Sequence, residues 1–276
     1  MKLKNKIAVI TGGSRGIGKK IVEVFLREGA TVIILARKKR EINKVVREFL
    51  PIAQGALIGF AVDVGDYKAV CAVVSKIEKK FGRVDVLVNC AGIQNPIAPF
   101  AMNKMGEWEK NIKINLLGTA YMCRTVIPNM IKRKSGTIVN FSGGGATSSR
   151  PNFSAYATAK AGVVRFTEVL SDELKGKNVR VNVIAPGAIN TKMLEEVLRA
   201  GKRAGNAEFG AAKKREKEGG ASAREAAELV VFLSSEDSVN LSGRLVSAVW
   251  DDWKHWNKKD IKKIMSGESL TLRRVK

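Results

Sequence analysis

Tyr156 and Lys160 stand four residues apart in the segment Tyr156-Ala-Thr-Ala-Lys160. The surrounding residues 155–174 have a helical pattern, and on a helix residues four apart share one face. A lysine ammonium beside a phenol stabilises the phenolate and lowers the pKa of the tyrosine from about 10 toward neutrality. Such a pair could move a proton on the oxygen of an alcohol or a ketone. An ordinary surface pair would have the same spacing, so the motif alone has little weight.

A second segment with chemical potential is Thr11-Gly12-Gly13-Ser14-Arg15-Gly16-Ile17-Gly18. It lies between a short apolar run and a helical pattern at 16–28. Glycines at such a junction let the backbone turn tightly and approach a pyrophosphate, which the amide groups and dipole of the helix N-terminus then bind. The position between a strand and a helix, more than the glycines themselves, predicts a dinucleotide site.

The elements that must position these residues alternate regularly along the chain. Apolar runs of strand length are followed by helical patterns, which predicts an α/β fold: a doubly wound, seven-stranded parallel sheet with helices on both faces. The expected strands are 7–11, 31–35, 56–62, 84–88, 137–141, 179–184 and 245–249. No linker or repeat interrupts them, so we expect one domain over 1–253. The polar stretch 191–220 is expected to form a mobile lid, and 254–276 a basic tail.

Composition restricts the class of protein. Hydrophobic residues make up 45% and charged residues 27% of the 276, an ordinary globular composition. The net charge of +23 indicates a lysine-rich surface or attraction to anions, but no nucleic-acid-binding motif is present, so no specific nucleic-acid partner is expected. Three cysteines without a CxxC pair favour a reducing compartment, and the single histidine excludes a two-histidine zinc site. With no signal-like or membrane-length apolar run, we expect a cytoplasmic protein without bound metal.

Taken together, the G-x3-G-x-G and Tyr-x3-Lys motifs resemble those of the short-chain dehydrogenase/reductase family. Further matches follow in the family's order over roughly 4–249: Asp63-Val64, Asn89-Cys90-Ala91-Gly92, Asn115 within an N-x-x-G segment, and Pro186-Gly187-Ala188-Ile189-Asn190-Thr191. The resemblance implies a Rossmann fold, a homo-oligomer (tetramer or dimer), and hydride transfer between a nicotinamide and a carbonyl or alcohol carbon.

The resemblance also implies roles for individual residues. Tyr156 would donate the proton, Lys160 would bind the nicotinamide ribose and tune Tyr156, and Asn115 would hold a water that connects Lys160 to solvent. The residues implied to bind the cofactor are Gly12, Ser14, Arg15, Gly16, Ile17, Gly18, Arg37, Asp63, Val64, Asn89, Ala91, Gly92, Tyr156, Lys160, Pro186, Gly187, Ile189 and Thr191.

The cofactor itself can be predicted from charge. An NAD-binding protein of this kind needs an acid at the end of the second strand, where this chain has Ala36-Arg37 and no acid in reach. Arg37 and Arg15 suit a 2′-phosphate, because guanidinium groups pair with phosphate in a fork. NADP(H) is therefore expected in preference to NAD(H).

The chain departs from the family pattern at the serine that binds the substrate oxygen. The family places it 13 residues before the tyrosine, where this chain has Gly143. Ser142 is adjacent, but a shift of one residue in a strand turns a side chain to the other face. The run Gly143-Gly144-Gly145 could allow a bulge that re-aims it. We expect Ser142 to contact the substrate; the alternative is a structural serine.

Three functions remain open. The first is an NADP(H)-dependent reductase or dehydrogenase of a small ketone, sugar or polyol. The second is a 3-oxoacyl-[acyl-carrier-protein] reductase, with Lys134 and Lys177 as basic contacts for the acidic carrier. The third is a non-catalytic NADP- or polyanion-binding protein. At the C-terminal end Trp250, Trp253 and Trp256 recur at a spacing of three, which favours packing on the body or a partner subunit over a substrate-facing wall.

Overall fold

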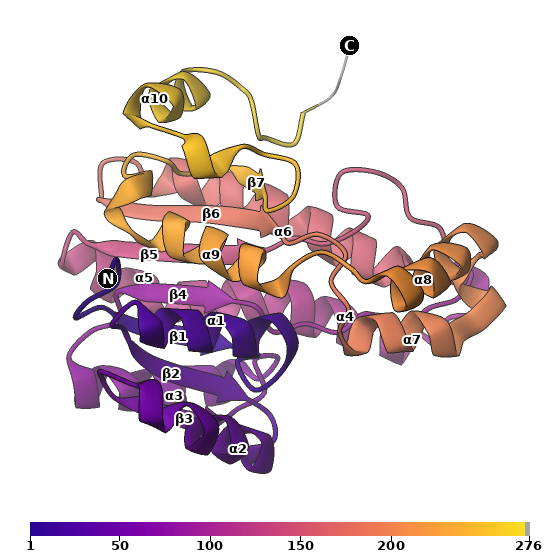
Figure 1. The fold of residues 1–276 in the computed structure, drawn as a ribbon, viewed down its shortest axis with the longest axis horizontal. Coiled ribbons are helices and arrows are strands. Elements are labelled where there is room, and N and C mark those ends of the chain that lie inside the picture. The colour runs from indigo at the N-terminus through magenta and orange to yellow at the C-terminus, as the bar shows by residue number, and fades with distance from the viewer. Residues whose placement is uncertain (274–276) are drawn as a thin grey trace.

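The computed structural model describes residues 1–273, which form one parallel sheet with helices on both faces (Figure 1). Its strands are β1 (Ile7–Thr11), β2 (Thr31–Ala36), β3 (Leu57–Ala61), β4 (Val86–Asn89), β5 (Gly136–Phe141), β6 (Val179–Ala185) and β7 (Leu245–Ser247). They are ordered β3-β2-β1-β4-β5-β6-β7, and every neighbouring pair is parallel. The predicted doubly wound, seven-stranded architecture is confirmed.

Ten α-helices occur in residues 1–273. They are α1 (Gly16–Arg27), α2 (Lys39–Phe49), α3 (Tyr67–Phe81), α4 (Met105–Ile112), α5 (Gly118–Lys132), α6 (Ser154–Glu173), α7 (Lys192–Ala200), α8 (Asn206–Glu218), α9 (Ala223–Ser234) and α10 (Lys258–Ser266). Local sequence sets several of their ends. The carboxylate of Asp66 accepts from Ala69 N at the start of α3, and Gly82, with φ of 77°, ends that helix.

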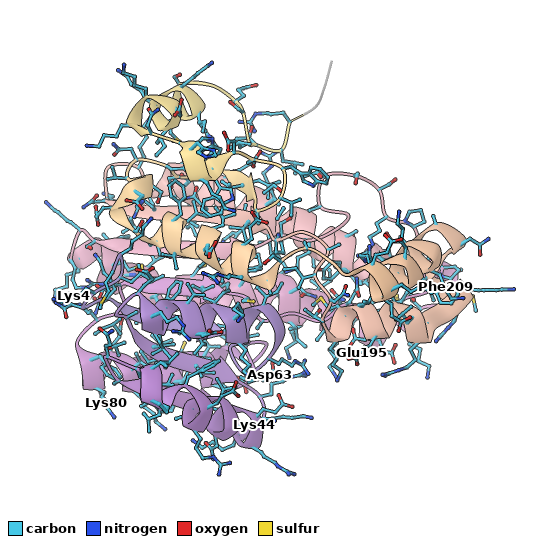
Figure 2. All side chains as sticks on the ribbon, viewed as in Figure 1. Lys4, Lys44, Asp63, Lys80, Glu195 and Phe209 are labelled. Atoms are coloured by element: carbon cyan, nitrogen blue, oxygen red, sulfur yellow. The ribbon has the colours of Figure 1, made fainter. Side chains whose placement is uncertain are left out.

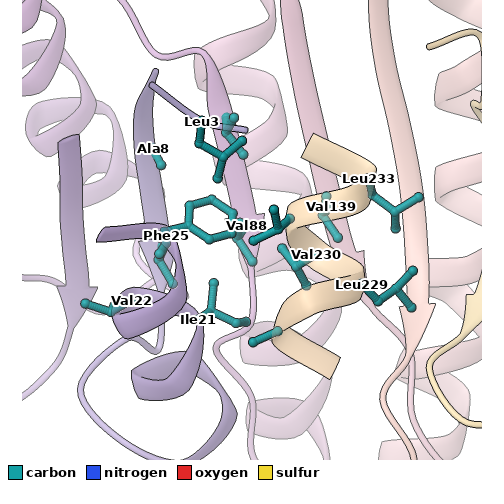
Figure 3. Packing of buried hydrophobic residues seen from close by; sticks show 14 of the residues in the cluster. Leu3, Ala8, Ile21, Val22, Phe25, Val88, Val139, Leu229, Val230 and Leu233 are labelled. Atoms are coloured by element: carbon teal, nitrogen blue, oxygen red, sulfur yellow. The ribbon is translucent and has the colours of Figure 1, made fainter. Parts of the chain in front are cut away.

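The sheet is buried on both faces, and each strand therefore contributes to two cores. Along β1, Ala8 and Ile10 face α1 and α9, whereas Val9 belongs to the core under α3 and α5. Figure 3 shows Phe25 of α1 and Val230 of α9 packed over the first face. This layering explains why the strands are almost continuously apolar in sequence.

The order of the strands creates a crevice. β1 lies between β2 and β4. From β1 the chain first adds β2 and β3 on one side, and it then returns to add β4 to β7 on the other side. Connections after β1 and β4 consequently diverge at the carboxyl ends of the strands, where ligands bind in folds of this kind. The glycine-rich turn after β1 lies at this point.

Residues 104–132 form two helices, α4 and α5, joined by a π-helical turn at Lys113–Leu117. The stretch 191–220, expected to form a mobile lid, contains two regular helices, α7 and α8, which project beside the sheet (Figure 1). We call α7, α8 and the turn between them the lid (192–218).

The C-terminal segment packs on the body, at least as far as residue 273. Trp253 and Trp256 lie 5.7 and 6.3 Å from the ring centroid of Phe232 on α9, which confirms packing for these two. Trp250 differs, because 86% of it is exposed. Leu270 accepts a hydrogen bond from Leu245 N of β7 and covers the free edge of that strand. Positions 274–276 of the expected tail lie outside the described residues. No helix in residues 1–273 is long and apolar enough to cross a membrane.

Candidate active site

A cleft of about 530 Å³ opens at the crevice between β1, β2 and β4, with α7 opposite. Figure 2 labels two residues that line it, Asp63 after β3 and Glu195 on α7. Most of the predicted cofactor residues line this cleft: Gly12, Ser14, Arg15, Gly16, Ile17, Gly18, Arg37, Asp63, Val64, Ala91, Gly92 and Thr191.

The glycine-rich turn fits a phosphate group. Gly12 has φ of 70°, and a Cβ there would lie 2.9 Å from Ala91 Cα. A Cβ on Gly18 would lie 2.3 Å from the carbonyl oxygen of Gly12. Arg15, the residue before α1, is extended and provides no side-chain cap, and no acid stands in the first turn of the helix. Uncapped amide groups at a helix start bind anions, so this turn fits a pyrophosphate.

The outer part of the cleft carries both signs of charge. Arg15, Arg37 and Lys38 line it, but so does Glu41 of α2. Ser14 Oγ donates to Glu41 Oε2 at 3.3 Å, and Lys38 Nζ lies 3.5 Å from Glu41 Oε1. The expectation that no acid stands in reach is therefore wrong: the first turn of α2 brings Glu41 back to the cleft. The sequence did contain a sign of this: the residues after Arg37 have a helical pattern, and a residue four positions later on a helix lies on the same face, one turn away.

A second cavity, of about 700 Å³, adjoins the first and will be called the chamber. It is lined by Tyr156, Lys160, Ser142 and Gly143, and by the predicted Pro186, Gly187 and Ile189. Both cavities share the residues Ile17, Cys90, Gly92, Thr191, Met193 and Leu194. Tyr156 and Lys160, the pair predicted to transfer a proton, thus line the chamber.

Tyr156 and Lys160 lie on the first two turns of α6 and are both buried. Lys160 Nζ donates to Phe141 O at 2.8 Å and lies 5.7 Å from the centroid of the Tyr156 ring. Burial lowers the pKa of Lys160 to about 8. Burial also raises the pKa of Tyr156 to about 12, opposed by the charge of Arg150. The expected lowering of the tyrosine pKa by Lys160 is not found: burial raises the pKa of Tyr156, and the cation that opposes this is Arg150.

Asn115 and Asn89 lie behind the cavities and do not line them. Asn115 sits in the π-helical turn, where its Nδ2 donates to Ile93 O at 2.8 Å and its Oδ1 accepts from Ile93 N at 3.2 Å. It therefore fixes the segment after β4 that lines both cavities; π-turns often occur at functional sites. Asn89 donates to Asn140 Oδ1 at 2.9 Å and joins β4 to β5.

The glycine in the serine position faces the tyrosine. A Cβ on Gly143 would lie 2.2 Å from Tyr156 Oη. Ser142 lines the chamber and is buried, and its backbone N donates to Ile184 O. Throughout residues 1–273, no hydrogen bond joins Ser142 to Tyr156. The tyrosine hydroxyl thus occupies the space that a side chain at residue 143 would need.

Sequence reasoning missed the polar wall of the chamber. It is formed by Gln94 after β4, Arg150 before α6, Glu208 and Arg215 on α8, and Asp251 after β7. These residues come from four separate regions, and no spacing in the sequence relates them. Trp250 also lines the chamber, so one of the three tryptophans does face the site.

A doubly wound sheet with a phosphate-binding turn at its switch point defines a dinucleotide-binding protein with a Rossmann fold. The sequence profile of the short chain dehydrogenase family matches residues 6–201. The chain therefore belongs to the short-chain dehydrogenase family. It is an oxidoreductase that acts on an alcohol or ketone with a nicotinamide cofactor.

Individual relatives extend the match over nearly the whole chain. A 3-oxoacyl-[acyl-carrier-protein] reductase of Thermotoga maritima is 34% identical over 246 residues, 89% of this chain and 97% of its own. A D-threitol dehydrogenase of Mycolicibacterium smegmatis is 34% identical over 192 residues, 70% of this chain and 73% of its own. The crystal structure of a levodione reductase aligns with a TM-score of 0.82 and 28% identity, covering 92% of this chain and 100% of that one.

Proposed function

We propose that the protein is an NADP(H)-dependent oxidoreductase that interconverts a small ketone, sugar or polyol and the corresponding alcohol or carbonyl. The observation that carries the proposal is the junction of the two cavities. Tyr156 and Lys160 line the chamber, which shares Gly92 and Thr191 with the cleft. A nicotinamide reaching this junction from the cleft would lie beside a carbonyl carbon held in the chamber.

The bound nicotinamide would supply or accept the hydride, and side chains of the protein would handle the proton. In reduction, Tyr156 Oη donates its proton to the carbonyl oxygen. The high pKa of buried Tyr156 keeps the phenol protonated, as an acid requires. Lys160, whose pKa burial lowers to about 8, would bind the nicotinamide ribose and tune Tyr156. Asn115 holds the segment after β4 and is proposed to hold a water beside Lys160.

The serine role is assigned to Ser142. A chamber that stabilises a developing oxyanion needs a hydroxyl donor besides Tyr156. Ser142 is a buried serine adjoining Gly143, and it lines the chamber. Gly143 carries no hydroxyl, so the role passes to Ser142, whose Oγ would have to turn toward the substrate oxygen.

The preference for NADP(H) rests on Arg15 and Arg37, which line the outer cleft together with Lys38. A 2′-phosphate placed there would meet three cations. Glu41 opposes it by its charge, but the same carboxylate is already held by Ser14 and Lys38. The cleft as a whole is lined by four acids (Glu41, Asp63, Glu195 and Glu196) and four cations, so the proposal rests on where Arg37 and Lys38 lie, directly after β2, together with Arg15 of the glycine turn.

A panel of carbonyls and alcohols, assayed by nicotinamide absorbance with each cofactor, tests the proposal. We expect turnover of at least one small ketone, sugar or polyol, with kcat/KM higher for NADP(H) than for NAD(H). Activity confined to NAD(H) would overturn the cofactor assignment, and activity only on carrier-linked thioesters would overturn the substrate class.

The second candidate is a 3-oxoacyl-[acyl-carrier-protein] reductase, favoured by the long match to the Thermotoga maritima enzyme. The basic residues expected to contact the carrier do not flank the site within one chain. Lys134 and Lys177 precede β5 and β6, at the opposite end of the strands from Tyr156. Assays with an acetoacetyl group on carrier protein and on a simple thiol separate the two candidates, because only the second predicts a strong preference for the carrier.

Assembly and location belong to the same proposal. Leu117 in the π-helical turn and Val169 on α6 leave 38% and 47% of their surfaces exposed, and we propose that they are covered in a homo-oligomer, a dimer or tetramer. Light scattering would measure its mass, and a monomer at micromolar concentration would contradict it. Cys71, Cys90 and Cys123 are free thiols, which favours the cytoplasm.

A further inference from the structure

Arg150 occupies an unusual position in the chamber wall. It lies in the loop between β5 and α6, six residues before Tyr156. Its Nε and Nη2 atoms donate to the two carboxylate oxygens of Glu208 on α8, both at 2.8 Å. The side chains of Arg150 and Glu208 are only 13% and 27% exposed. A bidentate pair of this kind holds both side chains in one geometry, which an exposed, single-bonded ion pair does not.

A second tie joins Arg150 to the other lid helix. With its amide oriented to satisfy both neighbours, Gln94 accepts from Arg150 Nη1 at 2.9 Å and donates to Met193 O of α7 at 3.0 Å. The guanidinium carbon lies 3.8 Å from the centroid of the Phe153 ring, which supports one face of the group. Arg150 therefore connects the loop before α6 to both lid helices, to α8 directly and to α7 by way of Gln94.

The glycine run that replaces the usual serine makes room for this arginine. A Cβ on Gly144 would lie 3.3 Å from Arg150 Nη1. Gly145 has φ of 92°, and a Cβ there would lie 3.0 Å from Arg150 Cβ. The departure from the family pattern at 143–145 and the position of Arg150 are thus parts of one local arrangement.

We propose that Arg150 is a positioning residue that clasps the lid over the chamber and sets the charge beside Tyr156. The same guanidinium then affects both how the lid closes on the substrate and how easily Tyr156 gives up its proton. This inference rests on the proposed role of Tyr156 as the proton donor.

The charge beside Tyr156 comes from several elements. The titratable and charged groups lining the chamber with it are Cys90, Arg150, Lys160, Glu208, Arg215 and Asp251. Of these, Arg150 lowers the pKa of Tyr156, and the Cys90 thiol raises it. Glu208 neutralises Arg150, so removing either partner changes the net charge near the phenol in opposite directions.

Two variants exploit this opposition. Arg150→Met removes the cation and the clasp, while Glu208→Gln removes the clasp and leaves the cation without its carboxylate. Both should raise KM for the carbonyl by about tenfold or more, since each loses a charge-assisted pair. In alcohol oxidation, which needs the phenolate, the midpoint of the pH–rate profile should rise for Arg150→Met and fall for Glu208→Gln, each by about half a unit or more.

The control is Glu228→Gln, which breaks the Arg224–Glu228 pair at 2.8 Å on the exposed face of α9. It should change neither KM nor the midpoint. Hydrogen exchange provides a readout apart from activity: amides of α8 should exchange faster in both clasp variants and normally in the control. If Arg150→Met fails to fold, Glu208→Gln still decides the matter.

Unchanged KM and unchanged exchange in Glu208→Gln would overturn the inference, as would midpoints that move in the same direction. Tyr156→Phe separates this failure from that of the proposed function. If Tyr156→Phe is inactive while the clasp variants behave as wild type, only the clasp is wrong. If Tyr156→Phe is active, the proposed role of the tyrosine is wrong as well.

Discussion

The cleft and the chamber are built by different means. The inner cleft is mainly backbone: the turn after β1, the start of α1 and the segment after β4 approach so closely that Gly12 and Gly18 cannot carry a Cβ. The chamber wall is mainly side chains, supplied by the segment after β4, the loop before α6, the lid and the segment after β7. A cofactor common to a family needs a fixed backbone cradle, whereas a substrate peculiar to one enzyme needs variable side chains.

The largest expected effect is a loss of catalysis in the chamber with cofactor binding in the cleft unchanged. Tyr156→Phe removes the proton donor, and general acid catalysis contributes about 10²–10⁴ in rate. Turnover should fall by that factor, while the dissociation constant for NADPH, measured by fluorescence titration, should change little, because Tyr156 lines only the chamber. Turnover within threefold of wild type would contradict the assignment.

The next effect breaks the cleft and spares the chamber. Arg37→Ala should weaken NADPH binding by about 10- to 100-fold, because it removes a charge-assisted contact to the 2′-phosphate. Ala36→Asp should go further and favour NADH, since a carboxylate accepts from the ribose hydroxyls and repels the phosphate. KM for the carbonyl at saturating cofactor should stay near wild type. A wild-type protein that binds NADH more tightly than NADPH contradicts both expectations.

The same contrast explains what could be predicted from the sequence. The alternation of strands and helices, the glycine turn and the shared helix face of Tyr156 and Lys160 follow from local patterns, because each depends on residues close together in the chain. Glu41 could have been predicted by following the helical pattern of α2 for one turn after Arg37. Arg150, Gln94 and Glu208 could not be found, since their contact depends on how the lid packs across the loop before α6. The fold alone brings them together.

A smaller effect tests the serine position. Ser142→Ala should lower turnover by about tenfold, as loss of one donor to a developing oxyanion does. Gly143→Ser should also lower it, because a Cβ at that position would lie 2.2 Å from Tyr156 Oη. Steady-state kcat for the two variants is the measurement. A silent Ser142→Ala together with a faster Gly143→Ser would show that the usual serine site still operates.

The smallest expected effect concerns Glu41, the acid beside the cations of the outer cleft. Glu41 accepts from Ser14 Oγ and lies near Lys38, so its carboxylate competes with a 2′-phosphate for both groups. Glu41→Gln removes the negative charge and frees Lys38, and NADPH should bind about two- to fivefold more tightly, the range of an exposed charge pair. The effect should shrink with added salt, because exposed charges are screened.

A matched control lies on the same helix. Glu48→Gln on α2 breaks the pair with Lys19 of α1 at 2.7 Å, away from the residues that line the cleft, and should leave both cofactor affinities unchanged. Titrations of the two variants with NADPH and NADH at two ionic strengths give the answer. If Glu41→Gln instead weakens NADH and leaves NADPH unaffected, Glu41 is the ribose acceptor of an NAD enzyme. In that case the acid on α2, and not the arginines around it, determines which cofactor the backbone cradle receives.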